Sequence, residues 1–371
     1  MPRPLVSTIN RTEWITDIQL ATTNTQVALP TNGGLIPNDR FIKKMYLQFE
    51  GRITNAGSNN PTGTQADLQY ALLDTILVQG LHRGRGQFEQ FINARGPDLR
   101  ELALIYQTRA PFSNLSNLSL GINATNDFRF IIPIDFTPMN CSLAQQVDWL
   151  LDAPNYDALK LAINYGDDQS VFTYGTRGVP TFSAFGSGTG NPRIRVHCEF
   201  AQAGQSQFAG FVPARLWRYF YEDTSSDVTS TTTNARMANI PRGYRIRNIL
   251  VKSGTKSAAV ASGNNSYNTL LNTMLQNLKV MRGLNKSIRF YADQFAARED
   301  AAEAYSITPD TGYTLVDFAQ HGTWHESVDA SGLAAGPAGD TDFYWQSDTA
   351  GAANQAALFL YEELRGLPIA P

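Results

Sequence analysis

The sequence predicts an all-β fold made of two tandem eight-stranded jelly-roll sandwiches, with short helices in the loops. Short segments that alternate apolar and polar residues recur along the 371 residues, as half-buried strands do. Loops rich in Gly, Ser, Asn and Thr separate these segments. Helices do not alternate with strands, which argues against a parallel α/β sheet. One strand-like stretch occurs twice, about half the chain apart, which indicates one domain made twice.

The repeated stretch joins residues 36–47, IPNDRFIKKMYL, to residues 240–251, IPRGYRIRNILV. Both copies start with Ile-Pro and place their apolar residues in the same alternation. Since a one-residue slip would reverse the two faces of a strand, the match is one of structure as well as composition. Lys43 aligns with Arg247 in the repeat, and both residues interrupt an apolar strand face. We therefore expect each of these charges to lie where its sheet ends or meets another subunit.

The length of the chain favours two domains, each with its own core. Residues 203–210, AGQSQFAG, are the best linker in the sequence. We therefore expect residues 1–206 to form the first jelly roll, with an N-terminal arm over residues 1–12, and residues 207–371 to form the second.

The first half combines short strands with two short helices. Residues 97–107 have Pro97 in the first turn and apolar residues at helical spacing, which predicts a helix. Residues 13–29 are expected to form a strand with an irregular middle. The remaining expected elements are the repeated strand from Phe41, strands at 76–81, 87–93, 128–136, 157–166 and 193–200, and a short helix at 142–151.

The second half repeats this order in a shorter form. Its matching elements are the strands 278–284 (for 76–81) and 287–295 (for 87–93), the alanine-rich helix 296–305 (for 97–107) and the closing strand 357–364 (for 193–200). Other strands are expected at 213–223, 314–320 and 343–346. A helix at the same point of both halves strengthens the conclusion that the domain is duplicated.

The composition favours a soluble protein with a polar and weakly charged surface. Charged residues make up 17% of the chain, and the net charge of −3 argues against a dedicated nucleic-acid binder, which would carry a basic face. No apolar run reaches the roughly 18 residues of a membrane span. The N-terminus lacks the apolar core of a signal peptide, so we expect synthesis in the cytoplasm.

The chain has two cysteines, Cys141 and Cys198. Two are too few for a disulfide framework or a cysteine zinc site. A single bridge between them is geometrically possible, but buried thiols that act as small apolar residues are the commoner case.

The histidines argue against the metal-dependent enzymes that share a two-jelly-roll architecture. Such cupin enzymes bind their metal through a His-x-His pair, a downstream Glu and a third His. This pair is absent from the four histidines, which are His82, His197, His321 and His325. His321 and His325 are four residues apart, but the Gly and Trp between them argue against a helix that would align them. His197 shares a polar strand face with Glu199, where a solvent or interface role is favoured over metal binding.

No other motif indicates a catalytic, cofactor-binding or metal site. Residues 185–192, FGSGTGNP, lack the Lys-Ser/Thr of a phosphate-binding loop and are expected to form a hairpin loop. Calcium binding at residues 339–342 is an alternative, although short acidic loops are usually just solvated. The acidic pairs expected in loops or at a strand end are Asp167–Asp168, Asp340 with Asp342, and Glu362–Glu363. We therefore predict that the protein has no cofactor and is not an enzyme.

The chain resembles the double jelly-roll major capsid proteins of tailless, membrane-containing phages such as the tectiviruses, and more distantly the adenovirus hexon. Residues 41–55, FIKKMYLQFEGRITN, carry the resemblance, because a basic step leads into an alternating run that ends in Ile-Thr-Asn. Residues 128–136, 150–167 and 193–200 also fit the tectivirus pattern. The chain departs from that pattern in lacking a long Gln/Ala-rich N-terminal arm.

The resemblance implies a structural protein of the virion capsid, made in the host cytoplasm. Three copies would form a trimer with a pseudo-hexameric outline, and such capsomers would tile an icosahedral shell around an internal membrane. The implied partners are neighbouring capsomers, penton and minor capsid proteins, and lipid at the inner face, with no sequence-specific nucleic-acid contact. Outward residues such as Arg193, Arg195 and Glu199 would then face a neighbouring jelly roll.

The alternative is a carbohydrate-binding, receptor-like or lectin-like protein with two jelly-roll domains, because jelly rolls are common lectin scaffolds. Trp217, Trp324 and Trp345 are the residues that could stack on sugars. Trp217 lies in an aromatic strand where core packing is favoured, and the other two fall in long loops of the second half.

Overall fold

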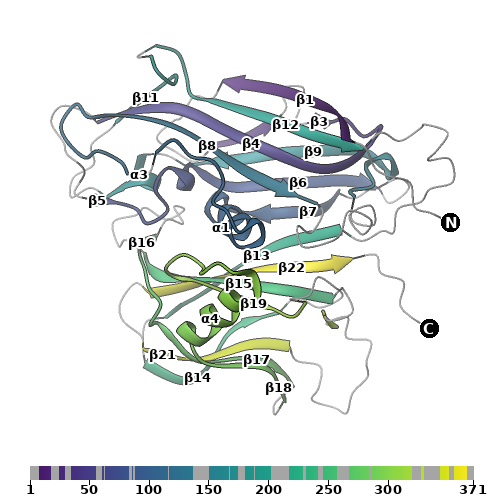
Figure 1. The fold of residues 1–371 in the computed structure, drawn as a ribbon, viewed down its shortest axis with the longest axis vertical. Helices are drawn as coiled ribbons and strands as arrows, with labels where there is room; N and C mark the ends of the chain where they lie inside the picture. Colours follow the sequence, from purple (N-terminus) through teal and green to yellow (C-terminus); the bar gives the residue numbers. More distant parts are fainter. Residues whose placement is uncertain are drawn as a thin grey trace.

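The computed structural model confirms an all-β fold made of two stacked sandwiches (Figure 1). The structure describes residues 8–17, 25–29, 35–55, 61, 63–82, 86, 88–115, 117–136, 150–166, 168–173, 180–187, 189–201, 217–228, 231–240, 245–256, 267–283, 286–319, 327–329, 343–350 and 355–365. In Figure 1, purple, blue and teal strands form the upper body, and mostly green and yellow strands form the lower body.

The first sandwich has two layers of four main strands each. One layer runs in the order β1 (Thr8–Asp17), β12 (Arg193–Ala201), β4 (Phe41–Thr54) and β8 (Thr125–Asp135). The other runs in the order β2 (Thr25–Leu29), β9 (Tyr156–Tyr165), β6 (Leu73–His82) and β7 (Phe88–Ala94). Short strands add to these layers or lie beside them: β3 (Leu35–Ile36), β5 (Gly63–Thr64), β10 (Phe172–Thr173) and β11 (Thr181–Ser183).

The second sandwich repeats both strand orders. One layer runs β13 (Trp217–Val228), β22 (Gln355–Arg365), β15 (Arg245–Lys256) and β19 (Tyr313–Asp317), with β16 (Tyr267–Leu270) and β20 (Val328–Asp329) also on β15. The other layer runs β14 (Thr231–Asn239), β21 (Phe343–Ala350), β17 (Leu275–Arg282) and β18 (Lys286–Asp293). Numbered along the chain, the eight main strands of each sandwich therefore lie in the orders 1-8-3-6 and 2-7-4-5, which confirms two jelly rolls in tandem.

The repeated stretches form the third main strand of each sandwich, β4 and β15. Both strands contain a bulge, at residues that align in the repeat. The pairing of β4 with β12 skips Lys43, and the pairing of β15 with β22 skips Arg247. The carbonyl of Lys43 accepts the N–H of Phe136 at 3.1 Å, and that of Arg247 accepts the N–H of Phe318 at 2.8 Å. A bulge changes the direction of a strand locally. The same bulge at matching residues shows that the two copies share backbone geometry as well as sequence pattern.

The inward faces follow the alternation of the sequence. In β4 the side chains of Met45, Leu47 and Phe49 are fully buried in the first core, and in β15 those of Ile249 and Val251 are buried in the second. The aromatic residues of β8 surround Phe49 with edge-to-face ring contacts. The period of two therefore predicts which face of each strand points inward.

Helix α1 (Gly96–Gln107) follows β7, and α4 (Gln294–Tyr305) follows β18, at the point where the sequence places a helix in both halves. Both helices end at a left-handed residue, Thr108 or Ser306. The shorter helical segments are η1 (Leu68–Leu72), η3 (Ala153–Asn155) and α3 (Asp168–Val171). Among the described residues, no helix is long and apolar enough to cross a bilayer.

Three sequence predictions about the first half need correction or lie outside the described residues. The expected single strand over 13–29 is two strands in different layers, and β1 begins inside the expected arm, because it pairs with β12 from Thr8 onward. The helix expected at 142–151 does not include its last residue, since Leu151 exchanges two backbone hydrogen bonds with Ile42. Residues 142–149 and the boundary between residues 206 and 207 lie outside the described residues.

Candidate assembly interface

Among the residues weighed for metal binding, the structure describes the side chains of His197 and Glu199. His197 lies on β12 opposite Tyr46, and Glu199 on the same face pairs with Lys44 at 3.3 Å. His82 lies in β6, with its side chain outside the description, as are His321 and His325 altogether. Over the described part of the chain, no three His, Cys, Asp or Glu side chains gather closely enough to hold a metal ion.

The structure also locates Cys198 and the loop 185–192. Cys198 is a buried free thiol whose burial raises its pKa, and Cys141 lies outside the described residues. The loop 185–192 closes on itself, with the Ala184 N–H donating to the Gly190 carbonyl at 3.0 Å. It is not a β-hairpin loop as predicted, because the flanking strands β11 and β12 both pair with β4 and follow one another along its edge.

Of the acidic pairs, the structure describes Glu362–Glu363, which lies near a strand end as expected. Glu362 and Glu363 lie near the end of β22 and are both buried. The side chains of Asp167 and Asp168 and the segment 339–342 lie outside the description.

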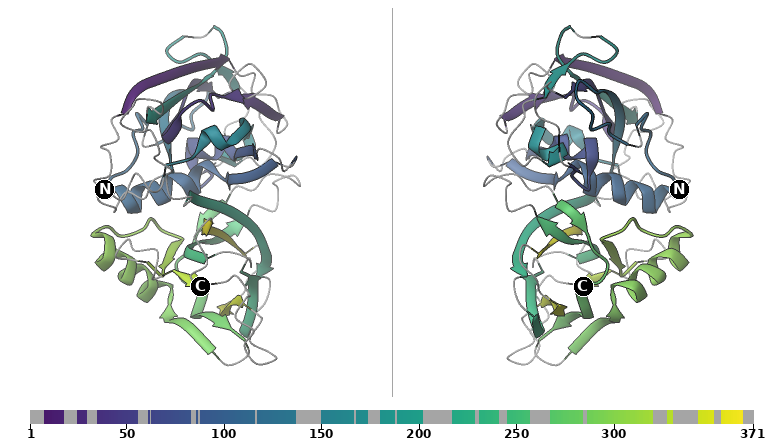
Figure 2. Two further views of the ribbon diagram at one scale, coloured as in Figure 1. Left: turned by 90° about the vertical axis from the view of Figure 1, so that its right-hand side faces the viewer. Right: turned by 90° about the vertical axis from the view of Figure 1, so that its left-hand side faces the viewer.

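The strongest polar constellation lies between the two sandwiches, and we call it the seam. Leu250, Leu315 and Leu360, on the outer face of the β13-β22-β15-β19 layer, belong to the same apolar cluster as the core of the first sandwich. The strands β7 and β13 also pair in parallel at Ile92 and Phe220, which joins the two bodies through one sheet. The outer face of this layer is thus buried inside the chain. Figure 2 shows α1 between the two bodies.

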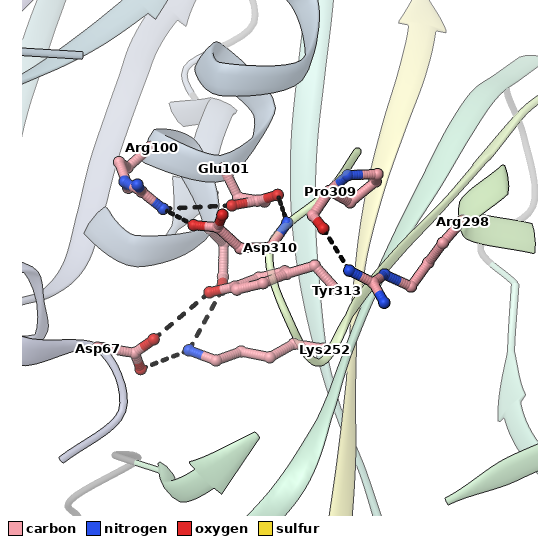
Figure 3. Close-up of polar contacts among 9 residues, drawn as sticks. Asp67, Arg100, Glu101, Lys252, Arg298, Pro309, Asp310 and Tyr313 are labelled. Atoms are coloured by element: carbon pink, nitrogen blue, oxygen red, sulfur yellow. Dashed lines mark hydrogen bonds and ion pairs between the residues drawn. The ribbon is translucent and has the colours of Figure 1, made fainter. Parts of the chain in front are cut away.

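The first polar cluster of the seam surrounds Lys252 of β15. Its ammonium lies 2.5 Å from Asp67 of the first sandwich (Figure 3). It also lies 3.7 Å from Asp98 of the same sandwich. The Tyr313 hydroxyl donates to Asp98 at 3.1 Å. Burial raises the pKa of Asp98, and the charge of Lys252 opposes that shift. The Lys252 ammonium therefore compensates the buried carboxyl groups of Asp67 and Asp98 at a place shielded from water.

The second cluster joins α1 to the segment after α4. Arg100 pairs with Asp310 and lies 3.4 Å from Glu101, while the Asp310 N–H donates to Glu101 at 2.8 Å (Figure 3). Burial raises the pKa of the Glu101 carboxyl to about 8, and the negative charge of Asp310 adds to the shift. Arg298 of α4 donates to the Pro309 carbonyl at 2.6 Å, which fixes this segment to its own sandwich.

The third cluster surrounds the bulge residue Arg247, which is only 2% exposed. Its guanidinium lies 3.4 Å from Glu362, and Tyr106 of α1 donates to the same carboxylate at 3.1 Å. The amide of Asn248 donates to both Tyr106 and Glu362. Arg247 thus meets the other sandwich of its own chain, which corrects the expectation that this charge marks a sheet end or another subunit.

The equivalent layer of the first sandwich, β1-β12-β4-β8, presents a charged outer face on the surface. Glu50 accepts from Arg129 and Arg195, each at 3.0 Å. Arg52 makes two bonds to Asp127, at 2.7 and 2.9 Å, and these lower the pKa of that carboxyl. The alternation in the sequence identifies these strands as polar on one side.

Sequence patterns single out Arg247 and Glu362, but they miss the seam residues around Lys252 because no local motif contains them. Asp67 and Lys252 are separated by 185 positions, and neither stands beside another charged residue. One signal was present in the repeat: Leu250 lies between Asn248 and Lys252 on the face that is wholly polar or aromatic in β4. An apolar residue on that face of only one copy indicates that this copy is covered.

Comparison with known proteins identifies the fold. No family model and no curated protein sequence matches the chain. The major capsid protein of Sulfolobus turreted icosahedral virus superposes with a TM-score of 0.62 and 14% identity, over 95% of this chain and 96% of that one. That of bacteriophage PM2 gives 0.53 and 10%, over 96% and 98%. VP54 of PBCV-1 gives 0.53 and 12%, over 98% and 95%. The chain therefore has the double jelly-roll fold of these viral capsid proteins.

Proposed function

We propose that the protein is a major capsid protein, with residues 1–206 and 207–371 as its two jelly rolls. In this proposal it trimerises into pseudo-hexameric capsomers and tiles an icosahedral shell around an internal membrane. The observation that carries the proposal is the match to viral major capsid proteins along 95% of the chain, which includes both sandwiches in order. The role is structural and not enzymatic.

The seam supplies the physical basis for such a building block. A capsid subunit must hold its two jelly rolls at a fixed angle to each other, because a small error in this angle would accumulate around a closed shell. Buried ion pairs such as Lys252–Asp67 are costly to break, since separation leaves a charge without a partner. The three polar clusters favour one arrangement of the two sandwiches, which suits a subunit that presents two equal corners to its neighbours.

The proposal extends to the partners of the assembled shell. These are further copies of the chain, penton and minor capsid proteins at other positions of the shell, and lipid at the inner face. The protein would be made in the host cytoplasm and reside in the virion capsid. Sequence-specific contact with nucleic acid is not part of the proposal, in keeping with the net charge of −3.

No observation on the described residues favours the carbohydrate-binding alternative. Trp345 is 1% exposed and packs against Phe359 with ring centroids 5.6 Å apart, so its face is not available to a sugar. Trp324 and the side chain of Trp217 lie outside the described residues.

Mass measurement of the purified full-length chain tests the proposal. Light scattering or native mass spectrometry is expected to give a trimer at micromolar concentration, and negative-stain micrographs are expected to show particles with a hexagonal outline. A chain that stays monomeric over this range and binds glycans on an array would overturn the capsid role. Co-flotation of assembled particles with anionic vesicles tests the lipid contact separately.

A further inference from the structure

Lys252 and two carboxyl groups, those of Asp67 and Asp98, meet in the buried part of the seam. They come from β15, from the residue before η1 and from the first turn of α1, and none is more than 8% exposed. A neutral lysine amine is a nucleophile, and a carboxyl group can accept it to give an amide. A second carboxyl group that carries a proton can serve as the general acid of such a reaction. The cluster therefore holds the three groups that amide formation between side chains requires.

The three groups lie within reach of one another. The Lys252 nitrogen is 2.5 Å from Oδ2 of Asp67, and the two side chains point toward each other in Figure 3. Oδ1 of Asp98 lies 3.7 Å from the same nitrogen. The Tyr313 hydroxyl lies 3.1 Å from Asp98 and 3.5 Å from Asp67, which connects the two carboxyl groups. A proton that leaves the nitrogen thus has a carboxyl oxygen nearby on either side.

The backbone holds each of these side chains in place. Lys252 lies inside β15, which pairs with β19 on one side and with β22 on the other. The residue before Asp67 is fixed to the second sandwich, because the Ala66 N–H donates to the Tyr267 carbonyl at 2.8 Å. Asp98 is part of α1. Reacting groups held in contact reach effective concentrations on the order of 10⁵–10⁸ M, which favours condensation over the reverse reaction with water.

The surroundings of Lys252 favour neutral groups over charged ones. Its nitrogen lies 5.0 Å from the ring centroid of Tyr267 and 5.3 Å from that of Tyr313, and both tyrosines are buried. Charges are more costly than neutral groups at such a place. The transfer of a proton from the ammonium to the Asp67 carboxylate is therefore less unfavourable than in water, and it leaves a neutral amine beside a carboxyl group.

Asp98 has one oxygen available for proton transfer. Its Oδ1 accepts from Tyr313, whereas its buried Oδ2 has no hydrogen-bond partner among the residues that the structure describes. Burial raises the pKa of Asp98; the charges of Lys252 and Arg95 oppose this shift, and that of Asp67 adds to it. A buried carboxyl group of this kind can hold a proton and pass it on.

We propose that the side chains of Lys252 and Asp67 condense to an amide after folding, with Asp98 as the proton carrier, so that the two jelly rolls of one chain become covalently joined. Lys252 first gives one proton to the Asp67 carboxylate. Its neutral Nζ then attacks Cγ of Asp67, and a second proton passes from Nζ through Asp98 to the hydroxyl of Asp67. The Nζ–Cγ bond forms, the bond from Cγ to that hydroxyl breaks and one water leaves. No group is oxidised or reduced, and Asp98 ends as it began.

Two other ion pairs of the chain each lack one of these conditions. Lys44 and Glu199 lie 3.3 Å apart, but their side chains are 22% and 13% exposed, so water stabilises both charges. Arg247 and Glu362 are buried at 3.4 Å, but a guanidinium keeps its proton and supplies no neutral amine. Neither pair is expected to condense, and Lys44 serves as the control within the same molecule.

Mass spectrometry of the purified full-length chain tests the bond. The denatured wild-type chain is expected to be lighter than its sequence by one water molecule. Since trypsin does not cleave after an acylated lysine, the digest is expected to contain residues 248–256 joined to residues 53–83, while cleavage after Lys44 proceeds normally. A chain of full mass after days at neutral pH, or a lighter chain without this branched peptide, would overturn the inference. The mass is that of a single chain, so the result does not depend on self-assembly.

Four variants test the role of each group. Lys252→Arg and Asp67→Ala each lack a reacting group and are expected to keep their full sequence mass. Asp98→Asn retains both reacting groups and is expected to form the bond on the order of a hundredfold more slowly, in samples taken after cell-free synthesis is stopped. Glu101→Gln changes another buried carboxyl group of α1 and is expected to react at the wild-type rate. Circular dichroism checks that each variant is folded. A wild-type rate in folded Asp98→Asn would overturn the role of Asp98.

Discussion

The outer sheet faces of the two sandwiches have the same strands in the same register but opposite surroundings. The face of β15, β22 and β19 presents Leu250, Leu360 and Leu315 to the first sandwich. The equivalent positions of β4, β12 and β8 are Tyr46, His197 and Pro133. Duplication has therefore kept the backbone and the inward faces, while each outward face has taken the character of what it covers.

The two helices differ in the same way. Ten of the twelve residues of α1 are buried, because it packs on its own sandwich and on the next. Only four of the twelve residues of α4 are buried, on the side that packs on its own sandwich. The difference shows that the sequence of a repeated element records its neighbours as well as its fold.

The largest expected difference between the two sheet faces lies at Lys252 and its counterpart Gln48. Lys252→Met removes the ammonium that pairs with the buried Asp67 and Asp98 and is expected to destabilise the fold by about 3–5 kcal/mol. Gln48→Met, on the partly exposed face, is expected to cost less than about 1 kcal/mol. Urea unfolding followed by tryptophan fluorescence measures both. Equal costs would mean that the seam is not the more tightly coupled region.

The pH dependence of stability separates Glu101 from its exposed counterpart Glu299. The pKa of Glu101 rises from 4.5 to about 8 in the folded chain, so the folded state holds a proton that the unfolded state releases. This contribution is fully present below about pH 4.5 and is lost as the pH rises through about 8, on the order of 3 kcal/mol between about pH 5 and pH 8. Burial raises the pKa of Asp98 and Asp317 in the same direction.

Urea unfolding at several pH values measures this slope in variants of both helices. Glu101→Gln is expected to flatten it, because the amide does not titrate, whereas Glu299→Gln is expected to leave it as in the wild type. A slope that Glu101→Gln does not change would assign the pH dependence to other groups.

A smaller effect is expected at the hydroxyl of Tyr106. Tyr106→Phe removes a donor to Glu362 and an acceptor for Asn248 while keeping the ring contact with Tyr305 at 5.3 Å. The loss of hydrogen bonds to a buried carboxylate is expected to cost about 1–3 kcal/mol. The matched change Tyr70→Phe, at a partly exposed ring beside Phe130, is expected to cost less. Thermal unfolding compares the two, and the reverse order would contradict the role given to Tyr106.

The smallest expected effect lies in the charged network of the outer sheet face. Glu50→Gln removes the negative partner of Arg129 and Arg195, whose side chains are 40% and 30% exposed. Water can solvate both arginines, so the expected cost is about 1 kcal/mol and decreases in high salt. Unfolding at low and high salt is expected to show this screening for Glu50→Gln and little of it for Lys252→Met. Salt dependence of equal size in both would contradict the contrast.

Much of the fold could be predicted from local pattern. The alternation in 128–136 and 193–200 predicts β8 and β12, and the helical spacing after Pro97 predicts α1. The division of 13–29 into β1 and β2 could not be predicted, because alternation is the same whether a chain continues in one layer or crosses to the other. The path of 185–192 could not be predicted for the same reason, since local sequence does not specify which strands pair.

The sequence by itself determined the two sandwiches, their inward faces and the duplication. Burial on one side of a strand imposes an alternation of apolar and polar residues that is visible in the sequence. Only the tertiary structure decided which outward face is covered. Lys252, Asp98 and Glu101 are ordinary surface residues in sequence, and they become a buried seam only when the second body packs on the first. The cost of burying a charge depends on the partners that arrive from elsewhere in the chain, and local sequence does not contain that information.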